Sequence, residues 1–131
     1  MEFVPLTQNE LRRYGPLELA YVGDGVYELM VRNALVRRGA ATAAGLHRRT
    51  VALVKASAQA VAAERVLPFL TEEEHDVFQR GRNAKPKAIP RRAEGADYMM
   101  ATALECLFGW LHLRGETGRI RELFDLAVGA D

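Results

Sequence analysis

Apolar residues recur at intervals of three and four along most of this 131-residue chain, and that spacing predicts helices. A capping box at residues 7–10 opens a short first helix, which ends at Gly15. Longer helices are predicted over residues 16–38, 46–67, 71–81, 97–113 and 117–128. No segment has a convincing strand pattern, so the sequence predicts an all-α bundle of about six helices in a single domain over residues 1–131.

One stretch permits a second interpretation. Residues 17–32 read LELAYVGDGVYELMVR, with Gly23 and Gly25 on either side of Asp24. A Gly-Asp-Gly between apolar runs can form the turn of a β-hairpin. However, the helical spacing continues beyond this stretch to Leu35, and a lone hairpin would have few strands to pair with. The helix is therefore the favoured interpretation.

Two carboxylates stand among apolar residues at helical spacing. Alanine and tyrosine are the main neighbours of Asp24 at three and four positions, and Phe108 and Gly109 are neighbours of Glu105. An isolated ionised carboxylate in such surroundings is costly unless it is paired or binds a metal. Three alternatives are open for this pair: ion pairs with arginines, positions at a surface seam, or a shared divalent cation such as Mg²⁺.

The two glycines that flank Asp24 also need an explanation. Each costs a helix about 1 kcal/mol relative to alanine. We expect the gain to be room beside the carboxylate for metal, water and the backbone of a ligand.

Charge is unevenly distributed, although the net charge is only +1. Acidic residues gather at 72–76, whereas residues 77–93 contain no acid and six basic side chains: Arg80, Arg82, Lys85, Lys87, Arg91 and Arg92. Prolines at 86 and 90 predict a loop over residues 82–92. Such asymmetry is typical of an anion-binding surface, with a solvated loop as the alternative.

The sequence also excludes several classes of protein. The single cysteine, Cys106, excludes an intramolecular disulfide and a zinc site built on several thiolates. The N-terminus has no basic segment followed by a long apolar run, and no stretch has about 18 uninterrupted apolar residues. We therefore expect a cytoplasmic protein without a membrane span.

Taken in order, these segments resemble the catalytic domain of ribonuclease III in its short Mini-III form. The run LAYVGDGVYE at 19–28 is similar to the signature helix of that family. The resemblance continues through HRRT at 47–50, VKASAQA at 54–60, RGRNAK at 80–85 and TALECLFG at 102–109. It covers roughly residues 14–128, and we expect no double-stranded-RNA-binding domain beside it.

The resemblance implies a Mg²⁺-dependent endoribonuclease that cuts double-stranded RNA as a homodimer and leaves 5′-phosphate and 3′-hydroxyl ends. In Mini-III enzymes the typical substrate is the precursor of large-subunit (23S) ribosomal RNA, and a ribosomal protein is a further candidate partner. Asp24 and Glu105 match the metal-binding catalytic carboxylates of the family. Full-length ribonuclease III enzymes have acids where this chain has Ala20 and Thr102, so only half of that four-carboxylate set is present.

Other polar residues are candidates by position. Glu28 lies one turn from Asp24 and is a candidate metal ligand, although an ion pair with Arg32 is the favoured interpretation. In the basic segment we expect RNA phosphates to be bound by Arg80, Arg82, Asn83, Lys85 and Lys87. A family stretch near the RNA groove matches Lys55, Ser57 and Gln59, with an exposed helix face as the alternative for Lys55 and Gln59. His47 lies in another matching segment and is a further candidate for RNA contact.

Two other functions stay open at this point. The first is a catalytically silent helical RNA-binding or ribosome-associated module, and the second is a helical interaction protein whose two acids form buried salt bridges. A silent module has no reason to keep both Asp24 and Glu105 in apolar helices, so the sequence favours the enzyme.

Overall fold

The computed structural model describes residues 3–39, 42–84 and 94–129, and these ranges are mainly helical. In chain order the elements are α1 (Gln8–Leu11), α2 (Pro16–Arg38), α3 (Ala43–Val54), α4 (Ala56–Val66), the 3-10 turn η1 (Leu67–Phe69), α5 (Glu72–Arg82), α6 (Glu94–Leu113) and α7 (Thr117–Val128). The described ranges contain no strand, so the predicted all-α bundle is confirmed and the hairpin alternative is wrong. None of the helices described is long and apolar enough to cross a membrane.

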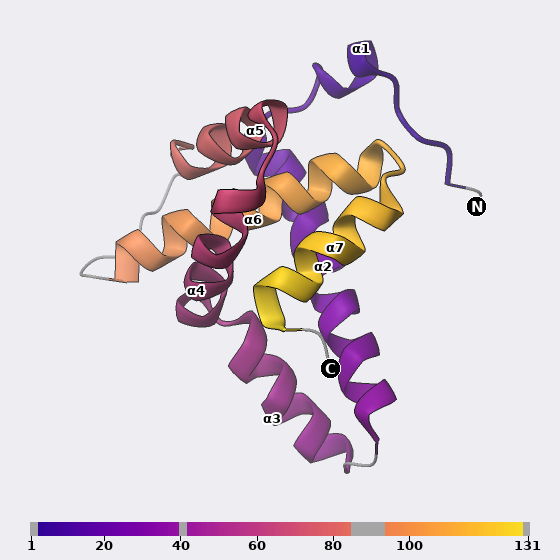
Figure 1. Cartoon of the computed structure of the whole chain (residues 1–131), viewed down its shortest axis with the longest axis vertical. Helices are drawn as coiled ribbons and strands as arrows, with labels where there is room; N and C mark the ends of the chain where they lie inside the picture. The colour runs from indigo at the N-terminus through magenta and orange to yellow at the C-terminus, as the bar shows by residue number, and fades with distance from the viewer. Residues whose placement is uncertain (1–2, 40–41, 85–93, 130–131) are drawn as a thin grey trace.

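Helix α6 forms the centre of the fold. It packs against α2, α4, α5 and α7, which surround it in Figure 1. The middle of α6 is apolar on nearly every side, and its fully buried side chains include Leu104, Leu107, Phe108 and Leu111. A helix that is apolar all round is stable only when other helices cover it, which explains its central position.

Two glycines allow α2 and α6 to cross at very short range. A Cβ at Gly23 would overlap the backbone carbonyl of Glu105, and a Cβ at Gly109 would overlap that of Leu19. Gly25 differs, because a Cβ there would meet no atom within 4 Å. The expectation that both glycines of the signature make room beside the carboxylate is therefore corrected for Gly23, which makes room for the backbone of α6.

The single helix predicted over residues 46–67 is in fact two helices. Helix α3 ends at Val54 and α4 begins at Ala56, because Lys55 between them has extended backbone angles (φ −63°, ψ 154°). The side-chain Nε2 of Gln59 donates to the carbonyl oxygen of Val54 at 3.0 Å, and so satisfies a carbonyl group at the end of α3. The other boundaries move by a few residues, as expected for helix ends.

A buried ion pair joins α7 to the start of α5. Glu74 is 5% exposed and accepts hydrogen bonds from Arg119 Nε at 2.9 Å and Arg119 Nη2 at 2.8 Å. It also accepts the backbone N–H of Thr71 at 2.9 Å, which completes the capping box of α5. Burial acts to raise the pKa of Glu74, but the hydrogen bonds from Arg119 and Thr71 outweigh it and lower the pKa. The ionised pair therefore stabilises this end of the bundle.

Candidate active site

The crossing of α2 and α6 brings the two predicted carboxylates together. Asp24 follows Gly23, whose Cα faces the backbone of Glu105. The side chains of Asp24 and Glu105 interact directly. Asp24 is exposed to solvent, whereas Glu105 is half-buried in the angle between the helices. The pair therefore forms a small acidic site that is open on the Asp24 side and closed behind Glu105.

The acidic pair is electrostatically strained when both carboxyls are ionised. Burial and the neighbouring charge of Asp24 raise the pKa of Glu105 from its ordinary 4.5 to about 8, although the side chain of Gln59 acts in the opposite direction. Two carboxylates in one site repel each other, and a cation between them removes this repulsion. The site thus favours either a proton on Glu105 or a bound cation.

The donor set fits a hard divalent cation. Mg²⁺ is commonly held by one or two carboxylates, with water and substrate phosphate as its remaining ligands. In the described part of the chain, no group of three or more His, Cys, Asp or Glu side chains is placed to hold a metal ion. A metal bound by Asp24 and Glu105 would therefore take most of its ligands from water and phosphate.

The positions that carry further acids in full-length ribonuclease III offer no ligand here. Ala20 and Thr102 are each 6% exposed, and the Thr102 hydroxyl donates to the carbonyl of Tyr98 in its own helix at 2.9 Å. Glu28 forms the predicted ion pair with Arg32, with Oε2 and Nη2 2.8 Å apart, so that interpretation is confirmed. A role for Glu28 as a metal ligand stays a prediction.

The residues predicted to contact RNA fall into three groups. Arg80, Arg82 and Asn83 are exposed at the C-terminal end of α5, and Lys85 and Lys87 lie outside the described residues. His47 is exposed on α3, and Lys55 and Ser57 are exposed at and just after the α3–α4 break. Gln59 is different, because it is only 1% exposed and its side chain points inward. Its place in the site was missed from the sequence, where a lone amide among four nearby alanines was the available signal.

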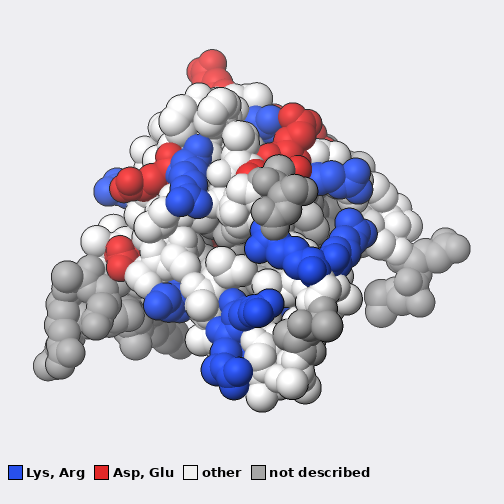
Figure 2. Space-filling view, turned by 60° about the horizontal axis from the view of Figure 1, so that its bottom comes forward, with Lys and Arg blue, Asp and Glu red and all other residues white. Residues whose placement is uncertain are grey.

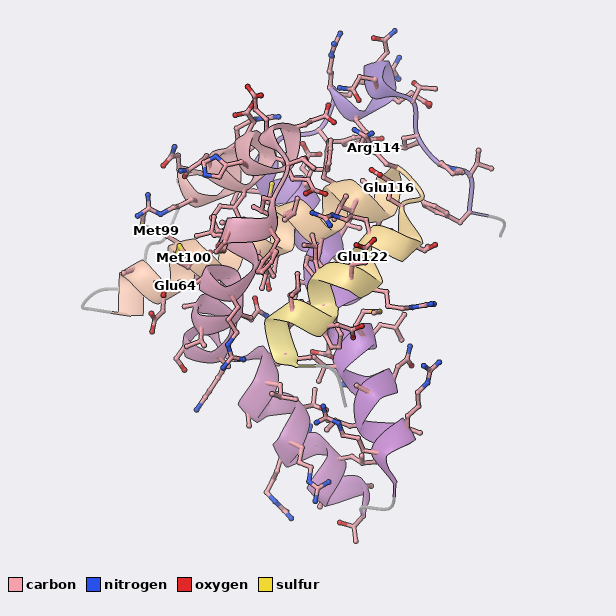
Figure 3. The ribbon with its side chains drawn as sticks, in the orientation of Figure 1. Glu64, Met99, Met100, Arg114, Glu116 and Glu122 are labelled. Carbon is pink, nitrogen blue, oxygen red and sulfur yellow. The ribbon has the colours of Figure 1, made fainter. Side chains whose placement is uncertain are left out.

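A groove of about 790 Å³ lies between α4, α5 and the first turns of α6. It brings together Ser57 and Arg82, two RNA-contact candidates that are separated by a whole helix in the sequence. Its other lining residues include Glu64, Asp97, Met99 and Met100, of which all but Asp97 are labelled in Figure 3. The groove is therefore mixed in charge, and its basic side is the end of α5.

Basic side chains gather on one face of the molecule. In Figure 2, lysine and arginine side chains occupy much of the middle and lower part of this face, while most acidic side chains lie in its upper half. A basic region of a surface raises the local potential and attracts a polyanion. This distribution agrees with an anionic ligand much larger than a single phosphate.

An apolar surface lies along the first turns of α2. Tyr21 is 84% exposed, and Leu17 is 40% exposed. A groove of about 850 Å³ beside Tyr21 is lined mainly by apolar residues, among them Phe3, Leu6, Tyr14, Val22 and Leu113. Contiguous exposed apolar surface of this kind marks a protein interaction site.

The chain is similar over most of its length to proteins whose family is known. A family model described as Ribonuclease III domain matches residues 17–116. A Mini-ribonuclease 3 of Symbiobacterium thermophilum is 44% identical over 113 residues, which cover 86% of this chain and 87% of that protein. Another from Gloeobacter violaceus is 47% identical over 112 residues, or 82% of this chain and 79% of that one. A crystal structure of a Fusobacterium nucleatum protein, 28% identical in sequence, superposes with a TM-score of 0.80 and covers 91% of this chain and 95% of its own.

Proposed function

Because this chain belongs to the ribonuclease III family and is an endoribonuclease of double-stranded RNA, we propose that it cuts its substrate with Mg²⁺ held by Asp24 and Glu105. Members of the family generally depend on a divalent metal and usually act as dimers. The observation that carries the proposal is the interaction of two carboxylates at the α2–α6 crossing, where burial and the charge of Asp24 raise the pKa of Glu105 to about 8. A cation bound between the two carboxylates would neutralise their repulsion, so the pair is suited to bind one.

The two carboxylates have different roles in this proposal. Asp24 is exposed, so a scissile phosphate can approach it from solvent. Glu105 is half-buried between the helices and would be the second carboxylate to hold the metal, in its ionised form. When bound, Mg²⁺ supplies Lewis-acid stabilisation of the charge that develops on the phosphate, and lowers the pKa of a bound water. The products expected are a 5′-phosphate and a 3′-hydroxyl end.

RNA contact is proposed for polar residues of α3, of the α3–α4 break and of the end of α5, and for two lysines outside the described residues. Double-stranded RNA is recognised mainly through shape, phosphates and 2′-hydroxyl groups, so a basic face without base-reading elements is sufficient for binding. The proposed contacts are Arg80, Arg82, Asn83, Lys85 and Lys87, together with His47, Lys55 and Ser57. Gln59 is left out of this set because its side chain is buried.

The apolar surface on α2 is proposed as the homodimer interface. Most soluble oligomers are symmetric, and a two-fold interface uses the same patch on both copies. The exposed ring of Tyr21 stands beside an apolar groove, so each copy offers both a projecting side chain and a recess for it. A dimer built in this way carries two acidic sites, one for each RNA strand.

The substrate proposed is the duplex stem of precursor large-subunit (23S) ribosomal RNA, with a ribosomal protein as a candidate partner. This is the substrate implied by the resemblance to Mini-III enzymes. A catalytic domain that reads duplex shape has little base specificity of its own. The precise choice of stem is therefore expected to depend on the shape of the precursor or on a partner that binds it.

The test compares cleavage of a precursor 23S stem and of an unrelated duplex of equal length, with Mg²⁺ and with EDTA. Asp24→Asn and Glu105→Gln are expected to lose nearly all cleavage while binding duplex, and Glu122→Gln, which changes an exposed side chain of α7, serves as the matched control. Unchanged cleavage by both site variants would refute the catalytic assignment. Salt-sensitive binding without cleavage by the wild-type protein would favour the silent RNA-binding module instead.

A further inference from the structure

We propose that Gln59 is a positioning residue, whose buried side-chain amide holds the Glu105 carboxylate in the orientation that binds the metal. The inference rests on the proposed function, because it gives Gln59 a part in the same site. It replaces the expectation that Gln59 binds RNA, since the side chain does not reach the surface.

Burial is the first observation. Gln59 is 1% exposed on α4, where Ala60, Ala62 and Ala63 are also buried. Helix α4 packs directly against α6, which carries Glu105. Glutamine is rarely buried so completely unless its amide has partners, because an unpaired amide in an apolar core is costly. The partners of this amide therefore identify what it does.

The amide nitrogen of Gln59 has two N–H groups, and they serve two different elements. It donates to the carbonyl oxygen of Val54, at the end of α3, at 3.0 Å. The Gln59 side chain also lies close enough to the carboxyl of Glu105 on α6 to act on it as a donor, which works to lower the pKa of that carboxyl. Because the amide group is planar, the bond to Val54 fixes the direction in which the second N–H points. Glu105 thereby receives a donor that is itself held in place by the backbone of another helix.

The amide oxygen of Gln59 has no hydrogen-bond partner in the described part of the chain, which is unfavourable for a buried polar atom. Gln59 Oε1 is buried and accepts no hydrogen bond from any described residue. The hydroxyl of Tyr27 is also without a hydrogen-bond partner among the residues described. Tyr27 is fully buried, and the charge of Glu105 acts to raise its pKa. The amide satisfies the carbonyl of Val54 but leaves its own oxygen unpaired within the described ranges, so the end of α3 alone does not explain a glutamine at this position.

The position of Gln59 also links the metal site to the proposed RNA contacts. The same amide satisfies the end of α3 at the break where Lys55 and Ser57 are exposed. The geometry of that break and the orientation of Glu105 are therefore set by one side chain. A change at position 59 is expected to affect the metal first, because the carboxylate has no other donor that is anchored to a neighbouring helix among the described residues.

The decisive variant is Gln59→Met, which has nearly the same length and no N–H group. Mg²⁺ binding without RNA is measured by isothermal titration calorimetry, and cleavage of a duplex is measured as a function of Mg²⁺ and of RNA. We expect Mg²⁺ to bind about 10–100-fold more weakly, as is usual when a residue that orients a metal ligand is lost. At a fixed low Mg²⁺ concentration kcat falls with it, while KM for the duplex stays within about two-fold of wild type. The melting temperature is expected to fall only slightly, because the variant loses one hydrogen bond to the carbonyl of Val54 and gains an apolar side chain in a buried position.

The matched control is Thr50→Val, which removes a buried hydroxyl that donates only within α3, to Leu46. It should leave Mg²⁺ affinity unchanged. Equal weakening of Mg²⁺ binding by this control, or unaltered binding and kcat in Gln59→Met, would overturn the inference. Gln59→Asn keeps the amide but is too short to reach both partners, so it should weaken Mg²⁺ binding as well, and it provides a second test if the methionine variant folds poorly. Failure of the wild-type protein itself to bind Mg²⁺ would instead overturn the proposed function, and this inference with it.

Discussion

Glu105→Gln is expected to make the metal-free protein more stable at neutral and alkaline pH while it abolishes cleavage. The folded structure raises the pKa of Glu105 from 4.5 to about 8, mainly through burial and secondly through the charge of Asp24. The folded protein therefore binds this proton more tightly than the unfolded chain does. It follows that the wild type is most stable below pH 4.5 with respect to this group, and loses that stability as the pH rises through about 8.

The size of this change in stability follows from the difference between the two pKa values of Glu105. At ~1.36 kcal/mol for each pKa unit, the difference between the folded and ordinary values corresponds to an upper limit of ~5 kcal/mol. Glu105 is partly exposed, and solvent screens part of this penalty, so we expect ~2–3 kcal/mol at alkaline pH. Glutamine has nearly the same shape and no charge, and therefore avoids the penalty at every pH.

The assay is chemical unfolding in EDTA at about pH 5, 7 and 8.5, with the protein concentration held constant because dimerisation would add to the apparent stability. The free-energy difference between Glu105→Gln and wild type should grow with pH. The control Glu122→Gln, which loses an exposed contact with Arg119, should stay within about 0.5 kcal/mol of wild type throughout. Added Mg²⁺ should stabilise the wild type and not Glu105→Gln. A difference that does not change with pH would refute the assignment of Glu105 as a destabilised carboxylate.

Two further variants test the packing. Gly109→Ala places a Cβ against the carbonyl of Leu19 and should destabilise the fold by about 3 kcal/mol or more. Gly25→Ala places its Cβ in open space and should stabilise α2 by up to about 1 kcal/mol. Urea unfolding measures both variants, and equal effects would contradict the close crossing of α2 and α6. Arg119→Met leaves the Glu74 carboxylate buried without its partner and should cost about 3–5 kcal/mol of stability at neutral pH. The loss should be smaller in acid, because a carboxyl with a lowered pKa stabilises the fold only at pH values above its ordinary pKa. Thermal unfolding across pH measures this, and a loss that is the same at every pH would argue against the ion pair.

Local sequence determined the helices and the residues with unusual chemistry. The capping boxes that begin α1 and α5 were readable because a hydroxyl and a glutamate three residues apart satisfy the first N–H groups whatever the rest of the chain does. The helical spacing around Asp24 favoured a helix over a hairpin, and the cost of a lone carboxylate in an apolar helix singled out Asp24 and Glu105. These inferences depend only on neighbours a few residues away.

Tertiary structure decided how those residues work, because each remaining question depends on a distant part of the chain. A glycine is required at position 23 because the backbone of α6, some 80 residues later in the chain, lies against it. Its neighbours in sequence suggested instead that it makes room beside Asp24. Periodicity shows which residues share a helix face but not which helix covers it, and so it did not show that Asp24 stays exposed while Glu105 is enclosed. The break between α3 and α4 at Lys55 has no glycine or proline to mark it in the sequence. The role of Gln59 depends on the packing of α4 against α6, which buries its side chain, and on its hydrogen bond to the end of α3.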